Sequence, residues 1–146
     1  MNATNPVENQ VRQALGSWVE AACAKDLDRI MGHYAPDVRA FDAILQLQFE
    51  GVDAYRKHWE TCLSYTSGPM IFEVEDLRIE TEGDLAVGHF LNRCGCVNEQ
   101  GETQSSWMRG TVCYRLRDGD WKIVHEHYSA PFSVPDGAAL FNLKPR

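Results

Sequence analysis

A strand-like stretch near the C-terminus places two histidines and a serine where they could act together. Residues 121–129 alternate with a period of two, so His125, His127 and Ser129 are expected on the same strand face as the apolar Trp121. Imidazoles exchange protons near neutral pH. A strand face that begins apolar and ends with such groups is suited to forming one wall of a pocket, for chemistry or for binding alone.

The hairpin that leads into this stretch, with its turn at residues 118–119, decides which side chains join the histidines. A two-residue turn would pair Val112 with His125, whereas a glycine bulge at Gly119 shifts the pairing by one residue. We favour the bulged register, because it gathers aromatic, cationic and polar side chains on one surface. In that register Thr111 faces His125, Arg109 faces His127 and Trp107 faces Ser129.

A carboxylate from the N-terminal half is the second candidate group. Asp42 ends a short apolar strand at 38–42 and could serve as a general base, or it could cap the irregular run that follows. If Asp42 meets His127, either could move a proton next to a carbonyl, while Arg109 and His125 stabilise negative charge. We expect Asp42, His127, Arg109 and His125 to be catalytic, and Trp107, Thr111, Ser129, Tyr34, Trp18 and Trp59 to bind substrate.

Structural readings of the same residues stay open. Either histidine could be a half-buried, hydrogen-bonded residue, and Arg109 could pair with Asp42 or Glu126. Trp18 and Trp59 lie in periodic apolar settings that also suit a core.

A metal site is a further alternative. His125, His127 and Asp42 would supply the two imidazoles and one carboxylate of a non-haem iron site. A His-x-His spacing is common in strands, so we expect no metal and no cofactor. The five cysteines are scattered and odd in number, which favours reduced thiols in a cytoplasmic protein.

The elements that must position these residues fall into two halves. A helix is expected over 6–24, a short one after Asp26 that ends before Pro36, and a third from Gly51 to Ser67. From Met70 the period becomes two, with a phase switch at 75–76 that is typical of a β-bulge. The sequence predicts an α+β fold in which N-terminal helices cover the concave face of a curved antiparallel sheet.

Length and composition bound the organisation and the partners. A chain of 146 residues suits one domain, here 6–131, with a flexible N-terminus at 1–5 and a C-terminal tail at 132–146 that packs on it. The net charge of −7 argues against nucleic acid as a partner. No apolar run is long enough to span a membrane, and no secretion signal is visible, so we expect a cytoplasmic protein.

Taken together, these motifs resemble a known family. The sequence is similar to the SnoaL-like, ketosteroid-isomerase-like branch of the nuclear transport factor 2-like superfamily. The resemblance rests on residues 34–38, Phe41-Asp42, 50–59, 107–111 and above all 118–132, and it extends to the tail at 141–145.

The resemblance implies a cone-shaped α+β barrel with a cystatin-like fold and a homodimer through the outer sheet face, where we expect an apolar patch of Val112, Val124, Met108 and Tyr128. It also implies an isomerase-, cyclase- or dehydratase-type proton transfer on a small, partly apolar carbonyl compound, or a binding or dimerisation module without turnover. Asp42 occupies a position similar to the base of steroid isomerases. Trp18 and the strand bearing Arg109 stand where those enzymes have a Tyr and a protonated Asp. The resemblance therefore does not extend to the mechanism of the steroid isomerases.

Overall fold

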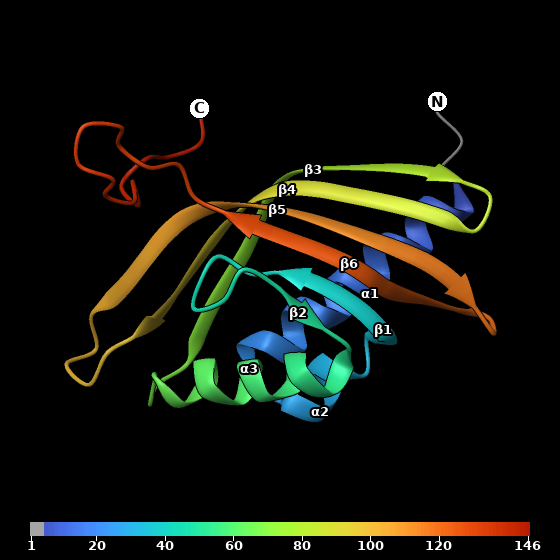
Figure 1. Ribbon diagram of the computed structural model, residues 1–146, viewed down its shortest axis with the longest axis horizontal. Coiled ribbons are helices and arrows are strands. Elements are labelled where there is room, and N and C mark those ends of the chain that lie inside the picture. The colour runs from blue at the N-terminus through green and yellow to red at the C-terminus, as the bar shows by residue number, and fades with distance from the viewer. Residues whose placement is uncertain (1–4) are drawn as a thin grey trace.

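The computed structural model describes residues 5–146, which form three helices and one sheet, and the helices lie against the curved sheet (Figure 1). The predicted flexible segment 1–5 lies outside the described residues except for Asn5. The elements are α1 (Pro6–Cys23), α2 (Leu27–Met31), β1 (Tyr34–Phe41), β2 (Phe49–Glu50), α3 (Val52–Ser64), β3 (Met70–Glu82), β4 (Leu85–Val97), β5 (Thr103–Arg117) and β6 (Asp120–Ser129).

The N-terminal helices form where the sequence signals predict them. Asn5 caps α1 by accepting a hydrogen bond from the Val7 N–H, and Asp26 caps α2 through the Arg29 N–H. Helix α2 is shorter than predicted, because it ends at Met31, and Tyr34 already belongs to β1. The strand therefore carries Tyr34 into the core, where its side chain is buried.

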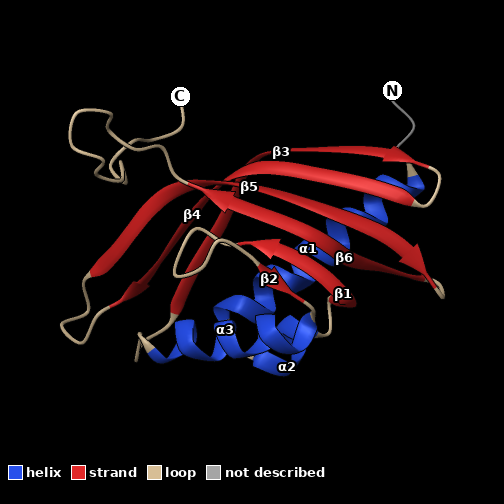
Figure 2. Cartoon of the chain, in the orientation of Figure 1, coloured by secondary structure: helices blue, strands red, loops and turns tan. Residues whose placement is uncertain are grey.

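The sheet has six strands in the order β2-β1-β6-β5-β4-β3. All neighbours are antiparallel except β1 and β6, which run parallel. Figure 2 shows the helices together on the concave side, with the strands bending around them. The predicted bulge in β3 is confirmed, since the β3–β4 register shifts between Glu75 and Arg78 and Asp76 has a φ of 54°.

The favoured register of the β5–β6 hairpin is wrong. Asp118 and Gly119 have φ values of 52° and 84°, which are the two left-handed residues of a type I′ turn. That turn pairs Leu116 with Trp121, which is the register of the two-residue alternative, in which Val112 would face His125. The register then shifts at Val124, so that Thr111 faces His127 and Arg109 faces Ser129.

This shift at Val124 also reverses the predicted faces of β6. Trp121 and Ile123 are buried on the concave side, but beyond the bulge Glu126 and Tyr128 take the buried positions, and His127 is exposed. A bulge inserts one residue into one strand, and it moves every later side chain to the other face. The histidines therefore lie on the convex face.

The predicted apolar patch on the outer face is wrong in its members. Val112 and Tyr128 are buried in the core beneath the sheet, and Met108 packs against the same core. None of the helices within residues 5–146 combines the length and the apolar composition that a membrane span requires. All five cysteines are free thiols.

Candidate active site

A cavity of about 370 Å³ lies between the helices and the concave face of the sheet. Its volume falls within the range of about 300–1,000 Å³ that is usual for small-molecule sites. Asp42 is the only charged side chain among the described residues that line it. The remaining lining residues are mainly apolar or aromatic: Trp18, Ala43, Ile44, Trp59, Cys62, Met70, Phe72, Asn92, Cys94, Ser106, Met108, Tyr128, Ala130, Ala139 and Phe141.

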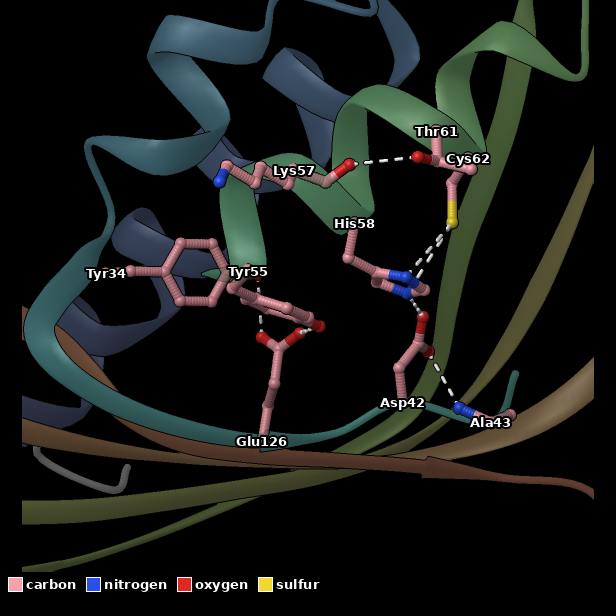
Figure 3. Close-up of polar contacts among 9 residues, drawn as sticks. All are labelled: Tyr34, Asp42, Ala43, Tyr55, Lys57, His58, Thr61, Cys62 and Glu126. Carbon is pink, nitrogen blue, oxygen red and sulfur yellow. Dashed lines mark hydrogen bonds and ion pairs between the residues drawn. The ribbon is translucent and has the colours of Figure 1, made fainter. Parts of the chain in front are cut away.

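Asp42 is held in a defined orientation at the wall of this cavity (Figure 3). Its Oδ2 lies 2.5 Å from Nε2 of His58 on α3, and its Oδ1 accepts a hydrogen bond of 2.9 Å from the Ala43 N–H. The side chain of His58 is almost fully buried, whereas that of Asp42 is 22% exposed. The pair therefore joins a fixed interior imidazole to a carboxylate that a ligand can reach.

His58 carries a proton at neutral pH. Its burial opposes the charge, but the hydrogen bonds to Asp42 and Cys62, together with the electrostatic interactions with both groups, outweigh burial and raise the pKa of His58 to about 9. The arrangement can accept a proton from a ligand at Asp42 while His58 holds that carboxylate in place.

A second carboxyl group lies deeper in the core. Glu126 on β6 is fully buried, and it accepts hydrogen bonds of 2.8 Å from Tyr34 and 2.5 Å from Tyr55. Figure 3 shows its carboxyl group between the two tyrosine side chains. Burial raises the pKa of Glu126 to about 8, although both hydrogen bonds act in the opposite direction. Trp18 extends this network by donating from Nε1 to the Tyr34 hydroxyl at 3.0 Å.

One group of side chains in the described part of the chain could hold a metal ion. Donor atoms of Asp42, His58 and Cys62 lie within 4.8 Å of one another. Two ligands of a tetrahedral zinc ion stand about 3.3 Å apart, given bond lengths of about 2.0–2.1 Å. The 2.5 Å separation of Asp42 Oδ2 and His58 Nε2 is instead that of a shared proton. The side chains are thus arranged as a hydrogen-bonded pair and do not fit a preformed metal site.

The structure separates the predicted site residues into two groups. Asp42, Trp18 and Trp59 line the cavity. Tyr34 is not among the lining residues, but its hydroxyl accepts the hydrogen bond from Trp18 Nε1. The other six are on the convex face, away from the cavity: Trp107, Arg109, Thr111, His125, His127 and Ser129.

The condition that Asp42 meets His127 is therefore not fulfilled, and the alternative of an iron-type ligand set from Asp42, His125 and His127 is excluded by the same separation. The bulge at Val124 is the physical reason, because it turns both imidazoles outward. His125 instead lies with Nδ1 2.7 Å from the Arg39 carbonyl oxygen. Arg109 donates from Nε to the Ser129 hydroxyl at 3.2 Å and pairs with neither Asp42 nor Glu126.

Sequence reasoning missed His58, Tyr55, Glu126 and Asn92. His58 could have been found, because it stands three residues after Tyr55 and four before Cys62, on the same stripe of α3. Glu126 could not, because its position depends on the bulge. Asn92 is in the middle of β4, at a position that otherwise suits an apolar residue.

Comparisons with known proteins agree with this architecture. A family model described as "SnoaL-like domain" matches residues 11–133. No functionally curated protein matches the sequence.

Among solved structures, the chain is 44% identical to an NTF2-like protein of unknown function from Pseudomonas putida, with a TM-score of 0.90 over 99% of this chain and 100% of that one. A ketosteroid isomerase-like protein from Erwinia carotovora is 15% identical, with a TM-score of 0.72 over 86% of this chain and 97% of that one. An NTF2-like superfamily protein from Salmonella enterica is 19% identical, with a TM-score of 0.76 over 94% and 100%. The last two share the fold alone.

Proposed function

Because the chain belongs to the SnoaL-like family of the NTF2-like superfamily, we propose that its cavity catalyses proton transfer next to the carbonyl group of a small, mostly apolar compound. Isomerisation, cyclisation and dehydration all begin with such a step. The observation that carries the proposal is Asp42, a carboxylate on the wall of an apolar cavity with its orientation fixed by His58 and the Ala43 N–H.

In this proposal Asp42 removes a proton from the carbon beside the carbonyl, and negative charge develops on the carbonyl oxygen. His58 is a positioning residue, since it is buried behind Asp42 and reaches the ligand only through that carboxylate. Tyr128 also lines the cavity, and burial raises its pKa well above the ordinary value, so its hydroxyl keeps its proton. A neutral hydroxyl can donate a hydrogen bond to the developing oxyanion.

The alternative is a binding module with the same cavity and no turnover. It is separated from the enzyme by deuterium exchange at C2 of 1-tetralone, a small bicyclic ketone, followed by NMR in D₂O. We expect the wild-type protein to accelerate exchange and the Asp42→Asn variant to lose about 100-fold or more of that rate. The His127→Ala variant should stay within about twofold, because its imidazole is on the other face.

Binding of 1-tetralone without any exchange above the buffer rate would support the binding module. Equal rates for the wild type and Asp42→Asn would remove Asp42 as the base. A loss in His127→Ala as large as that in Asp42→Asn would contradict the separation of the two faces.

We propose, as a second point, that two copies associate through the convex face. Half-buried apolar side chains on that face, Val87, Leu91 and Trp107, replace the patch expected from the sequence. Sedimentation velocity should show a dimer for the wild type, and a monomer for Val87→Glu with an unchanged circular dichroism spectrum. A monomeric wild type at micromolar concentration would reject this interface.

A further inference from the structure

Two cysteines line the cavity, and their surroundings differ. Cys62 is on α3 and Cys94 is on β4. The sulfur of Cys62 lies 3.5 Å from Nε2 and 3.9 Å from Nδ1 of His58. Within residues 5–146, no group hydrogen-bonds the sulfur of Cys94, and burial raises the pKa of that thiol to about 11. Cys62 therefore has an imidazole partner that Cys94 lacks.

The hydrogen bonds of His58 direct a positive charge at the Cys62 sulfur. The imidazole is protonated at neutral pH, since its pKa is about 9, and both ring nitrogens of a protonated imidazole donate. Nε2 donates to Asp42, which leaves the Cys62 sulfur as the partner of Nδ1 within residues 5–146. A cationic group beside the sulfur is typical of reactive cysteines, because it stabilises the thiolate that attacks an electrophile. Cys62 is thus one member of a charged cluster.

Asp42 supplies this cluster with a base. Donor atoms of Asp42, His58 and Cys62 lie within 4.8 Å of one another, a separation that one water molecule can bridge. The carboxylate can therefore receive the thiol proton, and His58 fixes the orientation of that carboxylate. A nucleophile, a base and a group that orients the base are the parts that covalent catalysis requires.

The cavity restricts the electrophile that this thiol can meet. Its walls are mainly apolar, and no lysine or arginine is among the described residues that line it. An anionic electrophile would be buried there without a cationic partner at the wall, which is costly. A neutral carbonyl compound with a conjugated double bond suits the cavity better, because it offers an electrophilic carbon without carrying a charge.

We propose that Cys62 is a covalent modification site that adds to neutral α,β-unsaturated ketones in the cavity. The sulfur forms a bond to the carbon β to the carbonyl group, and the electron pair of the carbon–carbon double bond moves toward the carbonyl oxygen as an enolate. Asp42 takes the thiol proton and returns it to the α-carbon. The product is a saturated ketone thioether that contains every atom of the enone. The role of Asp42 at the α-carbon rests on the proposed function, whereas the position of Cys62 beside His58 does not.

The test exposes the intact protein to 2-cyclohexen-1-one at neutral pH and locates the modified cysteines by mass spectrometry of proteolytic peptides. We expect Cys62 to gain the full mass of the enone at least about tenfold faster than any of the other four cysteines, because the protonated His58 hydrogen-bonds its sulfur. Cys62→Ser should remove the fast-reacting thiol. The same exchange outside the cavity, Cys113→Ser, should leave the rate at Cys62 unchanged.

Two further measurements address the base and the cavity. Asp42→Asn keeps the size of the side chain but removes the base, so it should slow the modification of Cys62 by about tenfold or more. An excess of cyclohexanone, which has the carbonyl group but no double bond, should protect Cys62 by occupying the cavity.

Modification of another cysteine as fast as Cys62, an unchanged rate in Asp42→Asn, or no protection by cyclohexanone would each overturn the proposal. Modification is measured without turnover, and exchange at C2 of 1-tetralone is measured without an enone. Fast modification of Cys62 without exchange would reject the proton transfer alone. Exchange without a preference for Cys62 would reject the modification site alone.

Discussion

Strand β6 presents a carboxyl group to the core and two imidazoles to the solvent side, only one residue apart. Glu126 is fully buried between two tyrosine hydroxyls, and its pKa is raised to about 8. Its neighbour His127 is exposed and contacts the Phe41 ring, with centroids 5.5 Å apart. These adjacent titratable residues therefore differ in solvation, because they lie on opposite faces of the sheet, and so they differ in the chemistry that is open to them.

On the concave side, the carboxyl groups of Glu126 and Asp42 also differ in how accessible they are to a ligand. Glu126 makes two hydrogen bonds to protein groups and is not among the residues that line the cavity. Asp42 has one oxygen on His58 and one on a backbone N–H, and its side chain remains partly accessible. The buried carboxyl group can act only on its protein neighbours, whereas the accessible one can meet a ligand.

The largest expected effect comes from truncating the sealed carboxyl group. Glu126→Ala leaves the hydroxyls of Tyr34 and Tyr55 without their acceptor and opens a void, so it should cost about 3–5 kcal/mol of unfolding free energy. His127→Ala on the convex face should change it by no more than about 0.5 kcal/mol. Urea denaturation measures both changes. Similar losses of unfolding free energy in the two variants would contradict the difference between the concave and convex faces of β6.

The dependence of stability on pH should follow the buried groups. The folded-state pKa of Glu126 is about 8 against an ordinary 4.5, and that of His58 is about 9 against 6.5. Both folded-state values are raised, so each group's contribution is fully present below its ordinary pKa and is lost as pH rises through the folded value. Unfolding free energy should therefore fall by a few kcal/mol between about pH 5 and pH 9.

Glu126→Gln identifies the share of Glu126 in this pH dependence. The amide cannot ionise. The unfolding free energy from urea denaturation should therefore fall less with rising pH in the variant than in the wild type, so that the stability of the variant relative to the wild type increases toward pH 9. A profile as steep as that of the wild type would mean that Glu126 does not hold its proton in the folded state.

A smaller effect tests how closely the concave face is packed around Tyr128. A Cβ at Gly110 would lie 2.6 Å from Phe90 Cε2 and 2.8 Å from Tyr128 Cε1, so Gly110→Ala should cost about 1–3 kcal/mol. At Gly88 the nearest atom would be Leu77 Cδ1 at 3.7 Å, an ordinary contact. Gly88→Ala should be neutral or slightly stabilising. Equal destabilisation by the two variants in thermal denaturation would contradict close packing at Tyr128.

The helices, the order of the helices and long strands, and the bulge in β3 could be predicted from the sequence. The phase change in β3 is visible, because the apolar Val74 and Leu77 stand an odd number of residues apart. In β6 the bulge is at Val124, directly after Ile123, and either of these apolar residues could belong to the buried face. Local pattern therefore cannot reveal that shift, and only the pairing with β5 and β1 determines it.

The candidate site was predictable only where local pattern and tertiary position agree. Asp42 follows the buried Val38 and Ala40 in strict alternation, and this alternation places its side chain on the concave side, at the cavity wall. Its partner His58 comes from another element, and no local rule specifies that contact. The histidines of β6 were assigned to the wrong face because one inserted residue outweighs an otherwise regular alternation.

The parallel pairing of β1 with β6 has a consequence for when the cavity forms. Tyr34 and Glu126 are 92 residues apart in the chain, and residues 39–41 of β1 pair with residues 125–127 of β6. Contacts of such long sequence separation require closure of a large loop and tend to slow folding. On a ribosome, the N-terminal helices emerge well before β6. Their apolar faces and the hydroxyls of Tyr34 and Tyr55 therefore lack their packing and hydrogen-bond partners until β6 has been synthesised. We therefore expect the sealing of Glu126 to be a late event in folding, and nascent chains that end before residue 126 to expose the interior that later becomes the cavity.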